Sequence, residues 1–356
     1  MKSTLFFLFF CGTGCFSFGG ITLNRDSLSG EKTDSLFIRK FRNHPQLLFE
    51  FARRRESFDL QSPVNDALMI RYEANTRVNF FGTFNYRWLS LSLGLFSFNA
   101  TDGEKKGKSS QFSLRASYNG RRFWNSNFIQ FTEGYYQVNP LVSNPAWNSS
   151  TDAYPQRPDM SSVTLFSNLL FCFKPEKFSY KAALWQLERQ EKSAGSFVAG
   201  LSYRLSILTS DTDRTLIPVT LYDQYAPEYR MVAIQQSNFT FHGGYIHSFV
   251  NKRHWYLTIY FLPGISIENG FYLPQDLLLR NYKSQVSLAS EFRFIIGYNG
   301  DRWFSGISSH SLSFSASRQQ GMLVDNSFNY VRVFAGYRFN EVDRTKGSKL
   351  LRKIGL

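Results

Sequence analysis

The sequence predicts an all-β protein, a transmembrane antiparallel up-and-down β-barrel, and its last predicted strand carries the first observation behind this prediction. Residues 327–339 alternate with a period of two. One face is wholly apolar and ends in the aromatic pair Tyr337 and Phe339, whereas the other carries Arg332 and Arg338. Lipid outside the barrel and a wet lumen inside would produce this division.

Composition and strand length are the other two observations. The chain has 356 residues and is 17% aromatic and 43% hydrophobic. Its mean hydropathy is nevertheless only −0.29, as expected when aromatic residues alternate with Ser, Gly and Asn. The alternating runs also reach the roughly 9–11 residues that a membrane-spanning strand needs.

Residues 1–19 read as a cleaved signal peptide, which would send the protein to the cell outer membrane. Lys2 precedes the apolar run 5–10, and Ser17 and Gly19 form a small-residue cleavage site. Alternatively, Cys15 could be lipidated, although no Leu stands three residues before it. The mature chain has no apolar run near the ~20 residues of a spanning helix.

Cysteine content and charge exclude several classes of protein. Cys172 is the only cysteine after the signal peptide, so no internal disulfide and no Cys/His metal spacing is available. The net charge of +14 and the pI near 9.6 would usually suggest nucleic-acid binding. Export and amphipathic strands argue against it. We expect no cofactor and no nucleic-acid partner, and outer-membrane lipid as the main surrounding.

The order of elements follows from these patterns. Residues 20–46 are polar and form either a periplasmic lead-in or a plug for the lumen. Strand candidates occupy residues 47–339, and residues 340–356 form a basic periplasmic tail. In the clearest predicted strands, apolar residues alternate with polar or small ones; these strands contain Leu91, Leu201, Phe241, Ile259 and Phe292.

Connections give the strand count. Short turns are predicted near residues 85–87, 119–121, 174–177, 251–253 and 299–301, and longer loops between them. In outer-membrane barrels short turns face the periplasm and long loops face outward, so the two kinds must alternate. Near residues 208–231 the expected alternation of short and long connections fails unless residues 215–222 form a strand. Pro218 counts against that strand, because proline cannot donate a hydrogen bond to a neighbouring strand. Accepting that strand predicts about fourteen strands with both mature termini periplasmic; twelve is the alternative.

Several stretches resemble an uncharacterised outer-membrane barrel family of the Bacteroidota, a domain-of-unknown-function family. These stretches are RPD at 157–159, KFSY at 177–180, ERQEKSAGS at 188–196, FLPG at 261–264 and GYNGDR at 297–302. The resemblance covers about residues 34–339. It implies an outer-membrane barrel and brings no activity or catalytic residue with it.

A search for catalytic groups finds little. A serine hydrolase on a barrel wall needs a His beside a Ser on the same face. Ser308 stands two residues before His310, but serine is abundant in that segment and coincidence explains the pair better. Glu291 lies beside Arg293 on one polar face, where a structural ion pair is the simpler interpretation. We therefore predict no catalytic residue and no enzyme.

The inward-facing charges are the most informative set. Charges that face lipid are costly, so the charged residues on polar strand faces should line the lumen. The predicted lumen-lining residues are Arg115, Arg204, Glu291, Arg293, Arg332 and Arg338. Rings of arginine favour anions in a pore. The competing interpretation is that they pair with acids or a plug and only hold the lumen together.

Three functions remain open. The first is a porin-like pore or uptake channel for small polar or anionic solutes, with an arginine-lined lumen. The second is a non-conducting structural barrel that binds an envelope protein partner. The third, ranked last, is an outer-membrane hydrolase. The sequence leaves the solute, an open or plugged lumen and the oligomeric state undetermined.

Overall fold

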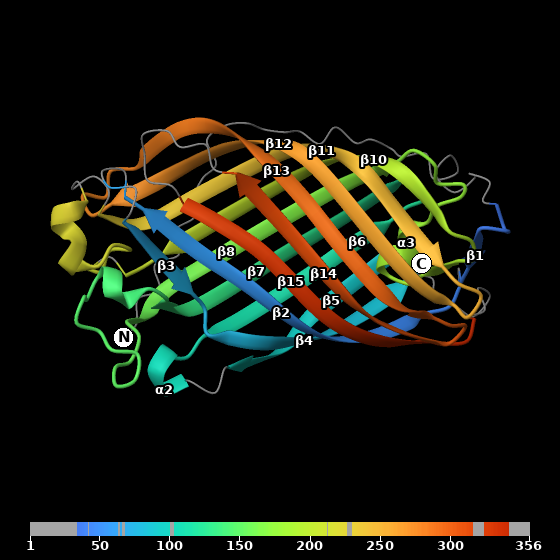
Figure 1. Cartoon of the computed structure of the whole chain (residues 1–356), viewed down its shortest axis with the longest axis horizontal. Helices are drawn as coiled ribbons and strands as arrows, with labels where there is room; N and C mark the ends of the chain where they lie inside the picture. The colour runs from blue at the N-terminus through green and yellow to red at the C-terminus, as the bar shows by residue number, and fades with distance from the viewer. Residues whose placement is uncertain are drawn as a thin grey trace, which may run out of the picture.

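The protein is a closed antiparallel β-barrel, seen here in a computed structural model (Figure 1). The structure describes residues 34–41, 43–62, 65, 68–99, 103–211, 213–225, 230–315 and 324–341. The predicted signal peptide (residues 1–19), Cys15 and nearly all of the predicted tail lie outside these residues.

Twelve strands form the wall, and antiparallel pairing of the last strand with the first closes it. The prediction of fourteen strands was therefore wrong, and the alternative count of twelve is correct. The strands are β2 (Gln46–Gln61), β4 (Thr76–Tyr86), β5 (Leu89–Asn99), β6 (Ser110–Asn119), β7 (Phe123–Gln137), β8 (Gln156–Cys172), β10 (Ala194–Thr209), β11 (Met231–Val250), β12 (Trp255–Pro274), β13 (Arg280–Asn299), β14 (Trp303–Ser315) and β15 (Val324–Arg338).

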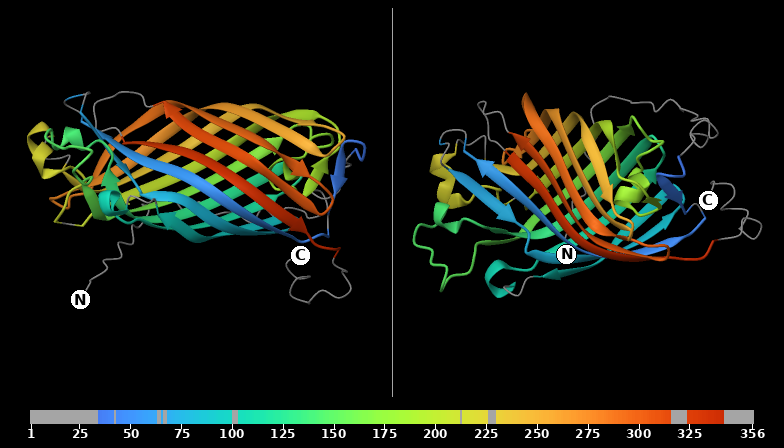
Figure 2. Two further views of the ribbon diagram at one scale, coloured as in Figure 1. Left: turned by 60° about the horizontal axis from the view of Figure 1, so that its bottom comes forward. Right: turned by 45° about the vertical axis from the view of Figure 1, so that its right-hand side comes forward.

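The two ends of the barrel differ. We call the end where β2 begins and β15 ends the terminal end, and the opposite end the loop end. Most connections at the terminal end are turns of a few residues, such as 87–88, 120–122, 251–254 and 300–302. The loop end carries the longer connections, with α2 (Gly103–Lys106), η1 (Pro140–Val142) and η2 (Val219–Gln224) (Figure 2).

An additional short strand narrows the loop end. β3 (Met69–Glu73) pairs with the second half of β2 and also with β7, where Tyr72 faces Gln137 and Glu73 faces Tyr136. At the loop end β3 therefore lies between β2 and β7, whereas nearer the terminal end β4, β5 and β6 lie between them. Because barrel diameter grows with the number of strands, this substitution makes the loop end the narrower of the two.

The strand faces are as predicted. On β15, Val331 and Val333 are about half exposed, whereas Arg332 and Arg338 are buried. The same alternation holds on the other strands, whose outward residues form an apolar belt around the barrel. The belt includes Phe51, Phe84, Leu91, Leu93, Phe112, Leu169, Phe197, Leu201, Phe241, Phe261, Ile265, Leu288, Phe292, Ile296 and Ile307.

Aromatic pairs border this belt at the terminal end. Trp303 and Tyr337 pack edge to face with ring centroids 4.7 Å apart, and Tyr337 contacts Phe339 in the same manner. Trp255 packs on Tyr298 beside the neighbouring turn. Such rings mark the interface between lipid and water in membrane barrels.

Two segments that the sequence assigned to the wall are not part of it. Residues 215–222 are not a strand: the segment enters η2 behind Pro218, and its residues Leu216, Ile217 and Leu221 are buried. Residues 174–177 are not a short turn but begin the connection 173–193, which holds α3 (Tyr180–Leu184) and β9 (Glu188–Gln190). Without the false strand, the twelve wall strands connect alternately at the two ends of the barrel, and the connection 173–193 is a long one at the terminal end.

The first of these segments lies at the loop end of the barrel and the second at the terminal end (Figure 1). We call residues 173–193 the plug and the described residues 210–211 and 213–225 the cap. The plug contributes Phe178, Tyr180, Leu184 and Trp185 to a core cluster at the terminal end. The cap contributes its apolar residues to a second cluster at the loop end.

Candidate functional site

The plug is ordered by its own polar contacts. The Ser179 hydroxyl caps α3 by accepting a hydrogen bond from the Ala182 amide at 3.1 Å, and it donates to Glu188 Oε2 at 2.5 Å. Arg121, from the β6–β7 turn, forms an ion pair with the same carboxylate oxygen at 3.0 Å. Glu188 thus joins the start of α3, the strand β9 and the barrel wall.

The described part of the predicted lead-in lies against the plug. β1 (Ile38–Lys40) pairs with β9 in an antiparallel two-stranded sheet. Arg39 and Arg189, one from each strand, both contact Asp301, at 3.1 and 2.8 Å. Burial alone would raise the pKa of Asp301, but these two arginines hold it below its usual range.

Wall residues hold the plug from the other side. Arg338 donates from Nη2 to the Gln186 carbonyl and to Asn299 Oδ1, both at 2.6 Å. The side chain of Gln186 donates to the Tyr256 hydroxyl at 2.7 Å. Arg332 reaches the Leu184 carbonyl at 3.1 Å. Predicted lumen arginines therefore anchor the plug.

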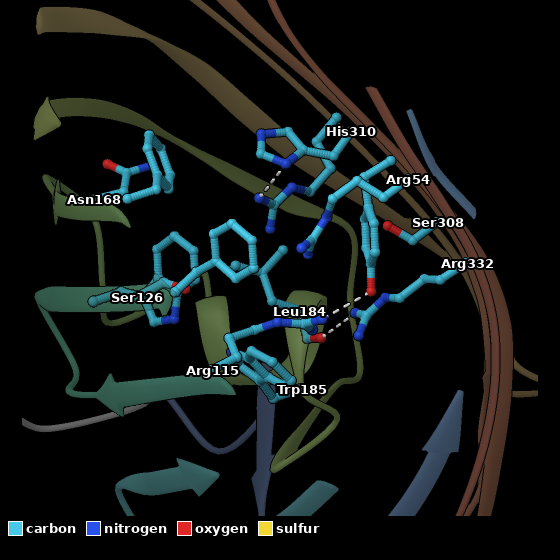
Figure 3. A pocket seen from close by; sticks show the side chains of 14 residues that line it. Arg54, Arg115, Ser126, Asn168, Leu184, Trp185, Ser308, His310 and Arg332 are labelled. Carbon is cyan, nitrogen blue, oxygen red and sulfur yellow. Dashed lines mark hydrogen bonds between the residues drawn. The ribbon is translucent and has the colours of Figure 1, made fainter. Parts of the chain in front are cut away.

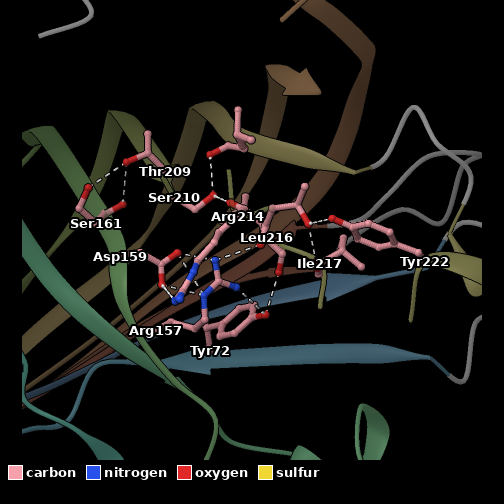
Figure 4. Close-up of polar contacts among 12 residues, drawn as sticks. Tyr72, Arg157, Asp159, Ser161, Thr209, Ser210, Arg214, Leu216, Ile217 and Tyr222 are labelled. Atoms are coloured by element: carbon pink, nitrogen blue, oxygen red, sulfur yellow. Dashed lines mark hydrogen bonds and ion pairs between the residues drawn. The ribbon is translucent and has the colours of Figure 1, made fainter. Parts of the chain in front are cut away.

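An arginine and a tyrosine fasten the cap (Figure 4). Arg157 forms a two-point ion pair with Asp159 and also donates to the Thr215 carbonyl at 3.0 Å. Tyr72, on β3, donates to the Leu216 carbonyl at 2.7 Å. Backbone atoms of the cap are thus bonded to both β3 and β8.

A cavity of about 70 Å³ lies inside the barrel and is bounded on one side by the plug residues Leu184 and Trp185 (Figure 3). We call this cavity the chamber. Four arginines line it, Arg54, Arg115, Arg293 and Arg332. The other lining residues are Trp124, Ser126, Phe128, Phe166, Asn168, Ser308, His310 and Tyr330.

One fully buried carboxylate forms ion pairs with two of these arginines. Glu50 accepts hydrogen bonds from Arg115 at 2.9 Å and from Arg332 at 2.6 Å, and the Tyr330 hydroxyl donates to it at 2.9 Å. Trp185 of the plug lies within cation–π distance of both guanidinium groups. The pairing therefore supports the plug as well as the wall.

A second buried carboxylate organises the opposite side of the chamber. Glu291 accepts from His310 Nε2 at 2.7 Å, from Asn168 at 3.2 Å and from the Tyr260 hydroxyl. Arg293 lies 3.7 Å from Glu291 and donates to His310 Nδ1 at 3.2 Å. His310 thus donates through one ring nitrogen and accepts through the other, which leaves neither nitrogen available to take a proton from Ser308.

The six predicted lumen residues all lie inside the barrel, but they do not form one site. Arg115, Arg293 and Arg332 line the chamber, with Glu291 beside it. Arg338 belongs to the plug contacts, and Arg204 is buried on β10. Among the described residues, no group of three or more His, Cys, Asp or Glu is arranged to hold a metal ion.

Two central residues, Glu50 and Arg54, were not among those predicted from the sequence. Both lie on β2, the first strand of the wall. There the three consecutive arginines at 53–55 interrupt the alternation of apolar and polar residues. Because strand residues alternate between two faces, Leu48, Glu50 and Arg54 share one face of β2, and the structure buries that face. The partner strand β15 supplies Tyr330 and Arg332 directly beside them.

Most of the stretches that carry the family resemblance meet at the two closures. Residues 177–180 and 188–196 include about half of the plug, and residues 297–302 supply Asn299 and Asp301 to its contacts. Residues 157–159 hold the cap. The stretch 261–264 contributes Leu262 to the plug core.

Comparison with known proteins returns barrels of the outer membrane and no curated relative. The outer membrane protease OmpT of Escherichia coli is 8% identical with a TM-score of 0.36, and the match covers 84% of this chain and 98% of that one. The KdgM porin is 9% identical with a TM-score of 0.26, covering 83% and 99%. The beta domain of the Bordetella autotransporter BrkA is 10% identical with a TM-score of 0.34, covering 82% and 99%.

A protein-family model matches most of the chain. It is described as a domain of unknown function (DUF4421) and matches residues 32–339, which include all the described strands. The closed barrel, its apolar belt and this match agree with the resemblance drawn from the sequence. The chain therefore belongs to the family of this domain of unknown function, DUF4421.

Proposed function

We propose that the protein is an outer-membrane uptake channel for small polar or anionic solutes that is closed at rest by the plug and the cap. The observation that carries this proposal is the arginine-lined chamber between two closures. A chamber with excess positive charge would select anions, and closures bonded through polar contacts could open without unfolding the wall.

The same proposal orients the protein. Short turns at the terminal end and longer loops at the loop end match the periplasmic and outer faces of membrane barrels. The described N-terminal segment and the plug would then face the periplasm, and the cap would face outward. Transport would require that the two closures open in turn or together.

Single-channel recording of the purified protein in a planar bilayer under a salt gradient tests the selectivity. We expect brief openings whose reversal potential reports anion preference. Arg54→Gln and Arg293→Gln should reduce that preference, because both side chains line the chamber. Arg302→Gln, which removes the same charge from the exposed β13–β14 turn, should leave it unchanged. Openings without anion preference in the unmodified protein would contradict the proposal.

The second candidate is a non-conducting structural barrel that binds an envelope protein partner. It is favoured by the extent of the plug core, which continues from Phe178 and Trp185 into wall residues such as Leu170 and Phe304. A folded barrel that never opens at any applied voltage would favour this candidate. A Ser308–His310 hydrolase is a weaker proposal, because both ring nitrogens of His310 already have partners.

A further inference from the structure

A charged side chain faces outward within the apolar belt. Arg53 on β2 is exposed, whereas the residues before and after it are buried. Directly across from it on β15 is Val331, which is about half exposed on the outer surface. Between Leu47, which faces Tyr337 at the aromatic border, and Arg53 the strand advances roughly 15 Å along the barrel axis, at about 3.4 Å per residue and a tilt of about 40°. Arg53 therefore lies well inside an apolar band of about 25 Å.

The charge of Arg53 is not balanced within the described part of the chain. Its guanidinium group has no ion pair, hydrogen bond or ring contact there. The next residue, Arg54, faces the lumen and donates to Gln130. A charge that faces hydrocarbon is costly, and an arginine in that position draws polar groups of the bilayer towards itself. Arg53 therefore requires an anion from outside the chain.

Polar groups continue on the same outer surface toward the loop end. Ser311 on β14 lies across from Asn329 on β15 and donates to its side-chain oxygen at 2.8 Å. The amide N–H groups of Asn329 have no acceptor among the described residues. Ser309, across from Val331, is half-buried on the same face. Diagonal neighbours in a sheet lie about 7–8 Å apart, within reach of a long side chain. We call Arg53, Asn329 and Ser309 the outer patch.

Apolar side chains border the outer patch on the side of the terminal end. Phe51 on β2 faces Val333 on β15, and both are about half exposed. Phe49, farther along β2, is exposed to a similar extent. A lipid in the leaflet at the loop end directs its headgroup toward that end and its chains toward the bilayer centre. Its headgroup would therefore meet the outer patch while its chains lie over Phe51 and Val333.

From these observations we infer that the outer patch binds the headgroup phosphate of an anionic lipid in the leaflet at the loop end. Arg53 supplies the positive charge, and Asn329 and Ser309 supply neutral donors; charge-assisted hydrogen bonds to phosphate are the strongest of this kind. The apolar side chains beside the patch favour a lipid over a free phosphate ion, because its chains can cover them. This inference goes beyond the proposed channel and holds whether or not the lumen conducts.

Lipid retention by the full chain tests the inference. The protein is reconstituted in nanodiscs of equal parts phosphatidylcholine and phosphatidylglycerol, and the lipids that stay bound after transfer to detergent are counted by native mass spectrometry. We expect preferential retention of phosphatidylglycerol, weakened on the order of tenfold by Arg53→Gln, the effect of losing a hydrogen bond to a charged group. Arg280→Gln is the matched control, because Asp276 already balances that exposed charge at 2.6 Å. Equal retention in all three proteins would overturn the inference.

The lipid dependence of folding is a second measurement, which does not require a lipid to survive detergent. Arg53→Gln should raise the urea midpoint in phosphatidylcholine vesicles, because it removes an unbalanced charge from the belt. This gain should shrink or reverse as phosphatidylglycerol is added, since a ligand that binds the folded state stabilises it. The same gain in both kinds of vesicle would show that no anionic lipid is bound by Arg53, and would contradict the inference.

Two other occupants give different results in the same spectra. Inorganic phosphate at constant ionic strength should not displace the retained lipid, because it has no chains to cover Phe51 and Val333; displacement would indicate a simple anion site and refute a lipid site. If a second copy of the chain covers the patch, Arg53→Gln should convert a dimer to a monomer without changing the retention of phosphatidylglycerol. That result would also refute the inference.

Discussion

At the scale of single residues, two buried carboxylates, Glu50 and Glu291, organise the interior by forming ion pairs with arginines. Glu50 is fully buried and accepts from Arg115, Arg332 and Tyr330, so a single acid compensates two cations. The period of two was enough to predict that arginines face inward, because charge is costly in lipid. It was not enough to predict which arginines meet, since that depends on strand register and on a plug whose path has no periodic signal.

Replacing Glu50 tests this arrangement. Glu50→Ala should lower the free energy of unfolding by about 3–5 kcal/mol, because it leaves two buried guanidinium groups without their carboxylate. Equilibrium urea unfolding in lipid vesicles measures the change. Asp276→Asn is the control: it breaks an exposed pair with Arg280 at 2.6 Å and should cost at most about 1 kcal/mol. Similar costs for the two variants would contradict the role assigned to Glu50.

At the scale of elements, the plug and the cap show where sequence reasoning failed. Residues 215–222 are apolar enough to be mistaken for a strand, but Leu216, Ile217 and Leu221 pack in the core cluster at the loop end, and Val219 is exposed. The plug has the same property around α3, where Ala182, Ala183 and Leu184 are buried. An apolar segment inside a barrel and one on its outside have similar compositions, so the sequence alone does not separate them. The wall strands, by contrast, were predictable because alternation fixes both of their faces.

The helix cap of the plug gives a local prediction. Ser179→Ala removes the acceptor for the Ala182 amide and should destabilise α3 by about 1 kcal/mol. We expect roughly fivefold faster hydrogen exchange at the Ala182 amide, measured by NMR or mass spectrometry, with the wall strands unaffected. Ser143→Ala, in the loop after η1, is the control and should leave α3 exchange unchanged. Unchanged exchange in Ser179→Ala would mean that packing alone orders the plug.

At the scale of the whole molecule, the barrel separates an apolar exterior from a polar and aromatic interior. Val333→Arg places a charge in the middle of the outward belt, between Val331 and Ala335 on β15. It should cost about 2–4 kcal/mol of folding free energy, as expected for a charge near the bilayer midplane. Equilibrium folding into vesicles measures this cost. Val219→Arg, on the exposed first residue of η2, should cost far less, and equal costs would contradict the proposed position of the belt.

The proposed channel has two separate closures in series along one lumen. Single-channel conductance of three variants tests it most directly: one with residues 176–191 replaced by a short Gly-Ser turn, one with residues 211–224 shortened likewise, and one with both changes. Shortening the exposed loop at 144–153 is the control for the effect of a deletion as such.

We predict that each closure alone keeps the barrel shut, so that the single variants stay almost silent while the double variant conducts steadily and prefers anions. Steady conductance through either single variant would contradict closures in series, as would a folded double variant that does not conduct.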